Sequence, residues 1–244
     1  MTSSKTKQSG LWTVICKREL SAYFSSPIPY IVCVVFLLFS GFRFFSTFFL
    51  IGRAELRNFF QFLPYLFSLF IPALTMRIFS EEKRSGSIET LLTLPVTPLQ
   101  VVVGKYLAAL LSGLVLLVPT LFYVLSCYML GKPDLGPIIG GYLGSIFLTA
   151  AFCAIGIFAS SSTKNQIVAF FISFAICATL SFVSAFAILL PSPVLPLVTF
   201  LSAASHFESI SRGIIDSRDV IYFVSVTALF LALTVNSIYN SRKG

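Results

Sequence analysis

The stretch IPYIVCVVFLLFSGFRFFSTFFLI, residues 28–51, carries a single charged side chain, that of Arg43. A helix needs about 20 apolar residues to cross the hydrocarbon core of a bilayer. A strand of an outer-membrane barrel alternates apolar and polar residues, whereas this stretch is apolar on every face. It therefore predicts a membrane-spanning helix.

The composition places the rest of the chain in the same class. Of its 244 residues, 57% are hydrophobic and 11% are charged, whereas about a quarter of an ordinary soluble domain is charged. We expect one all-α membrane domain, residues 1–244, with six transmembrane helices. The predicted spans are Ile28–Ile51, Phe59–Met76, Tyr106–Leu130, Ile138–Ser160, Ile167–Leu190 and Val220–Ile238.

The distribution of Lys and Arg predicts the orientation. Six spans put both termini on one side, and cytoplasmic loops are rich in basic residues. Both termini are therefore expected in the cytoplasm, together with Lys5, Lys7, Lys17, Arg18, Arg77, Lys83, Arg84, Lys105, Lys164, Arg242 and Lys243. The outer side is left with Arg53, Arg57, Lys132, Arg212 and Arg218. The net charge of +8 then indicates topology and attraction to anionic lipids rather than nucleic-acid binding.

The sequence predicts no catalytic, metal or nucleotide-binding site in this chain. Its five cysteines form no CxxC pair, so neither a metal site nor a disulfide framework is predicted. The only histidine, His206, lies in no nucleophile motif, which makes an intramembrane enzyme a distant alternative. The Gly-Lys pairs at residues 104–105 and 131–132 lack the upstream Gly and the following Ser or Thr of a phosphate-binding loop. We expect no catalytic residue, no metal and no cofactor in this chain.

Two segments are predicted to lie at the membrane surfaces. Residues 11–26 mix apolar side chains with Lys17, Arg18 and Glu19, as expected of a helix lying in the cytoplasmic interface. Residues 191–219 are too polar and proline-rich to span and too apolar for a free loop. We expect Leu195 to Arg212 to re-enter the outer leaflet, where protein must cover its backbone. The polar part of this element holds His206, Phe207, Glu208 and Arg212.

SEEKRSGSIETLLTLPVTPLQ, Ser80 to Gln100, is the longest polar interruption in the chain. It lies in a cytoplasmic loop predicted over residues 78–100. Its charged start and the apolar ridge of Leu91, Leu92 and Leu94 predict a short helix, which Pro95 and Pro98 would end. An apolar ridge favours contact with a partner over the alternative, a solvated connection.

Glycines, prolines and one arginine in or beside the predicted spans bear on how the helices pack. Gly136, Gly140 and Gly144 recur every four residues, so one helix face admits close approach of a neighbouring helix. Pro64 and Pro72 predict kinks in the second span. The charge of Arg43 inside the first span is costly unless it snorkels to the outer surface or faces a partner or substrate, and both interpretations stay open.

The segment SEEKRSGSIETLLTLPVTPLQVVVGKYLAALL resembles the first cytoplasmic loop of permease subunits of the type-two ABC transporter family. That loop has an acidic and basic run, then Gly, Ser or Thr, Glu, Leu-rich residues and Pro, and ends in Gly-Lys. CKRELSAYFSSPIPYIV is similar to the elbow helix and first span of these permeases, FIPALTMRIFSEE to the end of the second span, and HFESISRGIIDSRDVIYF to the entry to the last span. The nearest subgroup is that of bacterial permeases associated with gliding motility.

The resemblance implies a permease subunit of an ATP-driven exporter in the bacterial inner membrane. Family members pair two six-span permeases, identical or related, each seated on a separate ATPase that binds ATP and Mg, and some have auxiliary periplasmic or membrane subunits. The cytoplasmic loop supplies a coupling helix that docks on the ATPase. Carried over to this sequence, the coupling residues are Glu81, Glu82, Lys83, Arg84, Ser85, Gly86, Glu89 and Leu92. The alternative function is a structural membrane anchor of a motility or secretion complex.

Overall fold

A computed structural model of the chain describes residues 11–51, 55–87, 97–131, 133–189 and 195–241. These ranges fold into helices, and no strand occurs among them. Six helical segments of the described chain are long and apolar enough to cross a membrane, which confirms the predicted all-α class with six spans. They are α3 (Ile28–Ile51), α4 (Arg57–Thr75) continued by α5 (Ser80–Ser85), α7 (Pro98–Val115), α9 (Leu135–Ser162), α10 (Gln166–Phe182) and α13 (Ser217–Ser241).

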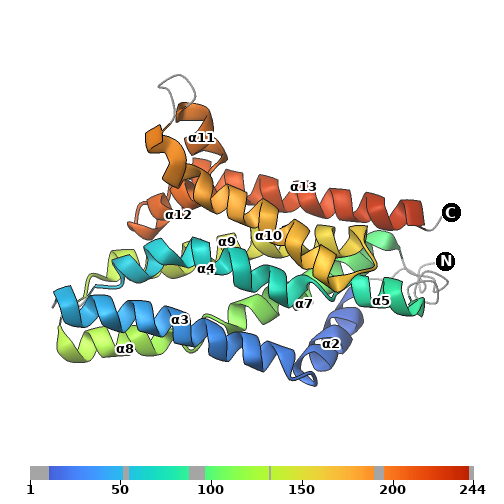
Figure 1. Ribbon diagram of the computed structural model, residues 1–244, viewed down its shortest axis with the longest axis horizontal. Helices are drawn as coiled ribbons and strands as arrows, with labels where there is room; N and C mark the ends of the chain where they lie inside the picture. The colour runs from blue at the N-terminus through green and yellow to red at the C-terminus, as the bar shows by residue number, and fades with distance from the viewer. Residues whose placement is uncertain (1–10, 52–54, 88–96, 132, 190–194, 242–244) are drawn as a thin grey trace, which may run out of the picture.

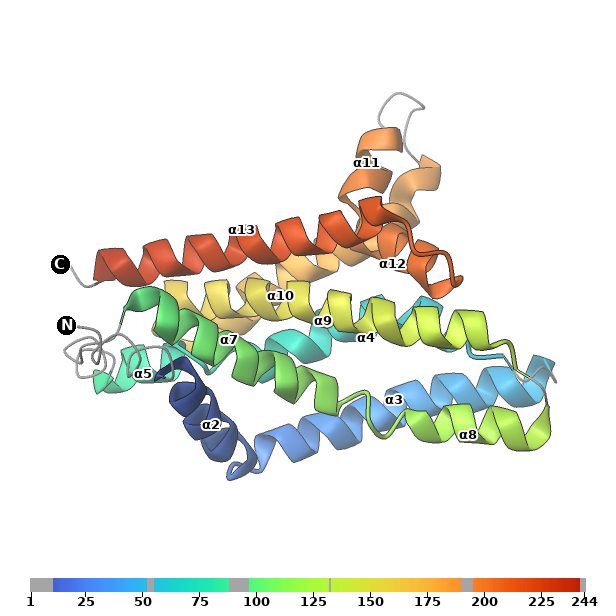
Figure 2. The ribbon, with the colours of Figure 1, turned by 180° about the vertical axis from the view of Figure 1, so that it is seen from behind.

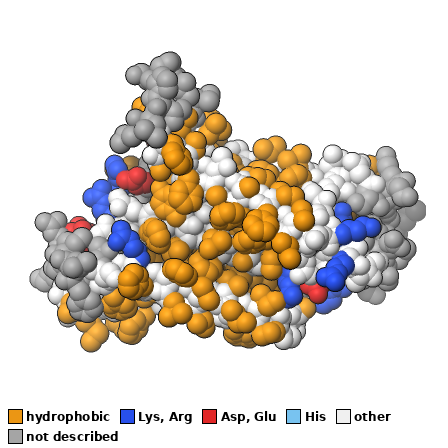
Figure 3. Space-filling view, viewed as in Figure 1, with side chains coloured by type: hydrophobic (Ala, Val, Ile, Leu, Met, Phe, Trp, Pro, Cys, Tyr) orange, Lys and Arg blue, Asp and Glu red, His pale blue; other side chains and the backbone are white. Residues whose placement is uncertain are grey.

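The long helices run side by side along the longest axis of the molecule (Figures 1 and 2). The start of α2 (Leu11–Phe24), α5 and the last turn of α13 lie at one end, here called the α5 end. The helices α11 (Leu195–Leu201) and α12 (Ala203–Ser211) lie at the opposite end, here called the α12 end. Figure 3 shows hydrophobic side chains across the middle and Lys and Arg toward both ends, the pattern of a protein that spans a bilayer.

Helix α9 lies at the centre of the bundle. Of its most apolar window 72% of the residues are buried, against 17% for α13 and 22% for α3. Small residues permit this central position because they let neighbouring backbones approach closely. A Cβ added at Gly141 would lie 2.5 Å from the ring of Phe60, and one at Gly156 would lie 2.8 Å from Cβ of Thr75. Helix α4 therefore packs directly on the backbone of α9.

The predicted third span, Tyr106–Leu130, differs in the structure. The helix that contains Tyr106 begins earlier, at Pro98, where Thr97 and Gln100 form a reciprocal capping box. This helix, α7, ends at Val115, and a series of tighter turns around Pro119 connects it to α8 (Leu121–Leu130). Proline has no backbone N–H to donate and its ring obstructs the preceding turn, so a continuous helix is broken there.

Pro98 was expected to end a helix, and it begins one. Its fixed φ angle and missing N–H suit the first position of a helix, where that N–H has no partner in any case. Pro95 and the predicted ridge of Leu91, Leu92 and Leu94 lie outside the described residues. Gly86 closes α5 instead, in the left-handed conformation at φ 76°, which glycine adopts without steric cost.

The α12 end is built from short helices. After α10 the chain continues as a 3-10 helix, η1 (Val183–Leu189), and α11 and α12 then precede α13. Helix α12 packs against α9, α4 and α13, and its apolar side is buried through Ala203, Phe207 and Ile210. The segment expected to re-enter the membrane is thus a pair of helices, one of which covers the end of the central helix.

Candidate functional site

A fully buried lysine lies at the α5 end of the molecule. Lys105 is on α7, and its Nζ atom donates hydrogen bonds to the backbone oxygen of Ile78, at 3.0 Å, and to Oε1 of Glu82, at 2.8 Å. Nζ also lies 3.2 Å from Oε1 of Glu19 on α2. A buried ammonium group is tolerated only when acceptors and opposite charge surround it, and this lysine has both.

Arg18 completes this cluster, here called the charged junction: Arg18, Glu19, Glu82 and Lys105. The guanidinium of Arg18 lies 2.8 Å from Oε1 of Glu19 and 3.6 Å from Oε1 of Glu82. The hydrogen bond to Glu19 raises the pKa of Arg18 further above its ordinary range. Two cations thus face two carboxylates. The second oxygen of Glu82 is buried and has no hydrogen-bond partner among the described residues.

The charged junction joins three helices because α2 and α7 approach closely beside it. A Cβ added at Gly104 would lie 2.8 Å from the backbone oxygen of Trp12 and 3.0 Å from Cβ of Ile15. Gly104 therefore permits the contact between the two helices, and Lys105, the next residue, supplies the charge that meets Glu19. The Gly-Lys pair at residues 104–105 thus holds α2 against α7.

Helix α5 is also fixed to the central helix. The hydroxyl of Ser160, near the end of α9, accepts hydrogen bonds from the backbone N–H groups of Phe79 and Ser80, both at 3.0 Å. The same hydroxyl donates to the backbone oxygen of Met76 at 2.9 Å. Lys83 donates to the backbone oxygen of Ser161. The break between α4 and α5 is therefore held by the end of α9.

The predicted coupling residues divide into two groups. Glu82 and Lys83 turn toward the protein, whereas Glu81, Arg84, Ser85 and Gly86 are exposed. Ser85 is the last residue of α5, and its hydroxyl lies 2.9 Å from that of Ser87. Glu89 and Leu92 lie outside the described residues. Of the predicted interfacial residues, Arg18 and Glu19 belong to the charged junction, and Lys17 is exposed on α2.

The predicted glycine face of α9 lies against α12. A Cβ at Gly140 would overlap the backbone oxygen of Ile210, and one at Gly144 would lie 3.2 Å from the ring of Phe207. Gly136 differs, because a Cβ there would meet nothing within 4 Å, although a Cβ added at Gly213 would lie 3.0 Å from the backbone carbonyl carbon of Gly136. The close approach of the two helices therefore depends on Gly140 and Gly144.

The remaining predicted residues of the α12 end form one hydrogen-bonded contact, made by His206, and one ion pair, between Glu208 and Arg212. The ring of His206 lies between two oxygens: Nδ1 is 2.7 Å from Oδ1 of Asp219, and Nε2 is 3.0 Å from the backbone oxygen of Phe200. It also stacks on Tyr222, with ring centroids 4.2 Å apart. Glu208 accepts a hydrogen bond from Arg212 at 2.6 Å, and both side chains are partly exposed.

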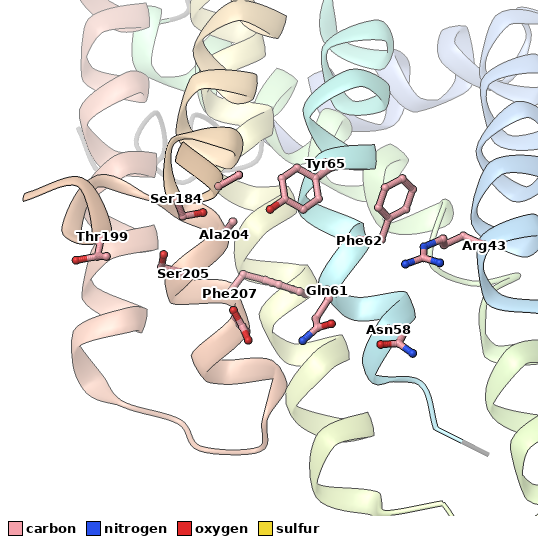
Figure 4. Close-up of a pocket in the computed structure, with 12 residues that line it drawn as sticks. Arg43, Asn58, Gln61, Phe62, Tyr65, Ser184, Thr199, Ala204, Ser205 and Phe207 are labelled. Atoms are coloured by element: carbon pink, nitrogen blue, oxygen red, sulfur yellow. The ribbon is translucent and has the colours of Figure 1, made fainter. Parts of the chain in front are cut away.

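A cavity with a volume of about 520 Å³ and several polar lining residues lies at the same end. Figure 4 shows the residues that line it. Helix α4 forms one wall, η1, α11 and α12 form the other, and Arg43 reaches toward α4 from α3. The guanidinium carbon of Arg43 lies 5.8 Å from the centre of the Phe62 ring.

Sequence reasoning missed Lys105, Ser160 and Asp219 as parts of these clusters. Lys105 and Asp219 are ionisable residues at the edges of apolar runs, and such residues generally have a partner. Their positions in the sequence therefore indicated that each has a partner, but the sequence did not indicate which residue that partner is. Ser160 carried no distinguishing signal.

Comparisons with known proteins agree with the architecture. The protein family described as ABC-2 family transporter protein matches residues 30–244. No curated protein matches the chain. Within the described residues no group of three or more His, Cys, Asp or Glu side chains could hold a metal ion.

Proposed function

The chain belongs to the ABC-2 family of transporter proteins, and from this premise we propose that it is the permease subunit of an ATP-driven exporter. In this proposal it lies in the bacterial inner membrane with both termini in the cytoplasm. A separate ATPase subunit binds ATP and Mg, and this chain is non-catalytic. A second permease, identical or related, completes the translocation path, since two-fold pairing is the commonest assembly of like subunits.

The observation that carries the proposal is the charged junction. Helix α5 is short, and a six-residue helix has little stability of its own. It is nevertheless fixed to α2 and α7 through Glu82 and to α9 through Ser160. A force applied to α5 would therefore reach three helices at once, including the central one. This is the property that a coupling element needs.

The exposed face of α5 is the proposed contact with the ATPase. Glu81 and Arg84 carry opposite charges there, and the adjoining residues 88–96 include the predicted candidates Glu89 and Leu92. Complementary charges on an ATPase would fix the register of docking and reject a wrong partner. Glu82 is paired with Arg18 and Lys105 of this chain. In this proposal it connects α5 to α2 and α7 and does not contact the ATPase.

The test uses the chain reconstituted with its ATPase subunit and compares Glu81→Lys and Arg84→Glu with Glu55→Lys, an exposed residue at the α12 end. Reversing a docked charge costs several kcal/mol, so the first two variants should bind the ATPase at least tenfold more weakly. The control should bind as the unmodified chain does. Normal binding and normal ATP hydrolysis in all three variants would contradict the docking face. Normal coupled hydrolysis without transport of any substrate would favour the anchor function.

A further inference from the structure

The ring of His206 faces a hydrogen-bond acceptor at each of its two nitrogens. Nδ1 lies 2.7 Å from Oδ1 of Asp219 on α13, and Nε2 lies 3.0 Å from the backbone oxygen of Phe200 on α11. A neutral imidazole has one N–H group, so its other nitrogen presents a lone pair. Beside an ionised Asp219, a neutral ring would turn that lone pair toward an oxygen, and only an imidazolium ring donates to both oxygens.

The contact therefore holds one proton more than a neutral ring and a carboxylate hold together. That proton belongs on the ring, because an imidazole binds a proton more tightly than an aspartate carboxylate does. Asp219 also lies in the first turn of α13, where the helix dipole favours a negative charge. Oδ2 of Asp219 is buried and has no hydrogen-bond partner among the described residues, so the ring is the group that balances this charge.

The elements that pack against α12 bring no further charge to the ring. Helices α9, α10 and α11 contain no Asp, Glu, His, Lys or Arg, and the one such residue of α4, Arg57, is exposed. Glu208, on α12 itself, is paired with Arg212. Asp216 and Arg218, at the start of α13, are exposed. The charge of the ring is therefore set by its aspartate partner and by the pH of the solution.

Two hydrogen bonds at neighbouring carbonyl groups tie the end of α11 to the bundle. One is the bond from His206 to Phe200, and in the other the hydroxyl of Tyr222 donates to the backbone oxygen of Leu201 at 2.7 Å. Tyr222 is also the aromatic residue of α13 on which the His206 ring stacks. The first of these bonds depends on the additional proton of the ring, and the second does not.

Helix α11 forms part of the wall of the cavity at this end. Thr199, next to Phe200, and Ser205, next to His206, both line it (Figure 4). Helix α11 projects away from the long helices (Figures 1 and 2), so it can move without displacing a membrane span. A change at His206 therefore alters one wall of the cavity and leaves the wall formed by α4 in place.

We propose that protonated His206 is a pH-sensitive latch that holds α11 against the cavity. When the ring releases its proton to solvent, its remaining N–H donates to Asp219, because a bond to a charged acceptor is the stronger one. The lone pair of Nε2 then faces the carbonyl oxygen of Phe200, and α11 is released. The closed form binds one proton more than the open form, so the latch is stable at low pH and is lost as the pH rises.

This proposal concerns the chain alone and holds or fails independently of whether an ATPase docks at α5. The experiment measures hydrogen exchange of the purified full chain in detergent between about pH 5 and 9, a range that includes the ordinary titration of histidine. Rates are corrected for the intrinsic effect of pH on exchange. Residues 195–201 report on α11, and residues 141–160 of α9 are the internal reference. Exchange in α11 should be about tenfold faster at the upper pH, as expected for a polar group that loses its hydrogen bond.

Two variants separate the latch from ordinary packing. In Asp219→Asn the amide can donate to Nδ1 of a neutral ring and leave the Nε2 proton for Phe200, so α11 should stay protected at both pH values. Tyr222→Phe removes only the bond to Leu201, so α11 should exchange faster at both pH values and keep its pH response. A pH response that persists in Asp219→Asn, or rapid exchange of its α11 at both pH values, would overturn the latch. An equal pH response in α9 would also overturn it, because the whole bundle would then be responding.

A second measurement reads the proton directly. His206 is the only histidine in the chain, so histidine labelled with ¹⁵N reports on this ring alone when the purification tag contains none. The nitrogen chemical shifts at pH 5 should be those of two protonated ring nitrogens, and one of them should change as α11 is released. An unprotonated ring nitrogen at pH 5, with α11 protected, would overturn the proposal.

Discussion

Nζ of Lys105 and Oε1 of Glu82 lie 2.8 Å apart, and the lysine side chain is wholly buried between α2, α5 and α7. Glu82 was expected on the free surface of a cytoplasmic loop, where a change of charge would matter only to a partner. The structure instead gives it an internal partner. A substitution at Glu82 therefore alters the stability of this chain as well as any docking surface, and substitutions at other residues must separate the two effects.

Lys105→Met should destabilise the protein strongly. Methionine keeps much of the volume but leaves Arg18 as the one remaining ion-pair partner of Glu19 and Glu82 among the described residues. Breaking a buried ion pair typically costs about 3–5 kcal/mol. The cost should fall toward the lower value because Glu19 and Glu82 are 19% exposed, and solvent screens them in part. Thermal unfolding of the purified chain in detergent measures the effect.

The control for this prediction is Glu81→Gln, which alters an exposed acid one residue from Glu82 and should change stability by less than about 0.5 kcal/mol. The double variant Lys105→Met with Glu82→Gln should lose less than the sum of the single losses, because the two residues share one interaction. Additive losses would show that the pair is not energetically coupled.

Gly156→Ala should destabilise the contact between α4 and α9. The added Cβ would overlap Oγ1 of Thr75 and lie 2.8 Å from its Cβ. Thr75 is fully buried, and its hydroxyl donates to the backbone oxygen of Ile71. Overpacking of this kind typically costs about 1–3 kcal/mol. The free energy of unfolding of Gly156→Ala is compared with that of Gly136→Ala, whose Cβ would meet nothing within 4 Å. The difference isolates the steric effect. A Gly136→Ala variant that loses as much stability would refute the packing explanation.

His206→Ala should loosen the α12 end. The substitution removes the ring that lies between Oδ1 of Asp219 and the backbone oxygen of Phe200, and it leaves the carboxylate of Asp219, which is 6% exposed, without its partner. A buried acceptor left unsatisfied costs about 1–3 kcal/mol or more when charged. Hydrogen exchange should rise in α11 and α12. Glu208→Ala, which removes a partly exposed pair on the same helix, should have a much smaller effect, and equal exchange in both variants would be evidence against a special role for His206.

The sequence predicted the class and the six spans because apolar runs of membrane length can be recognised one at a time. The prediction of the third span was wrong because the effect of a proline depends on its position in a helix. Pro98 begins α7, whereas Pro119 lies in the break between α7 and α8. It did not predict the charged junction, since Glu19, Glu82 and Lys105 are far apart in the chain. Nothing local to Glu82 distinguishes it from Glu81, although only Glu82 faces inward.

Ser160→Ala should detach α5 from the central helix while leaving the bundle folded. The hydroxyl of Ser160 is the acceptor for the backbone N–H groups of Phe79 and Ser80, and its loss leaves both buried donors without that partner. Hydrogen exchange at residues 79–85 should therefore increase by about tenfold, which corresponds to roughly 1.4 kcal/mol and lies within the cost of an unsatisfied buried group. Ser162→Ala is the matched control, because its exposed hydroxyl donates only to Phe158, one turn back in α9, at 2.9 Å. Unchanged protection of α5 in Ser160→Ala would show that Lys105 and Lys83 suffice to hold it. Increased exchange throughout α9 as well as α5 would show that Ser160 stabilises the whole bundle rather than the junction between α5 and α9.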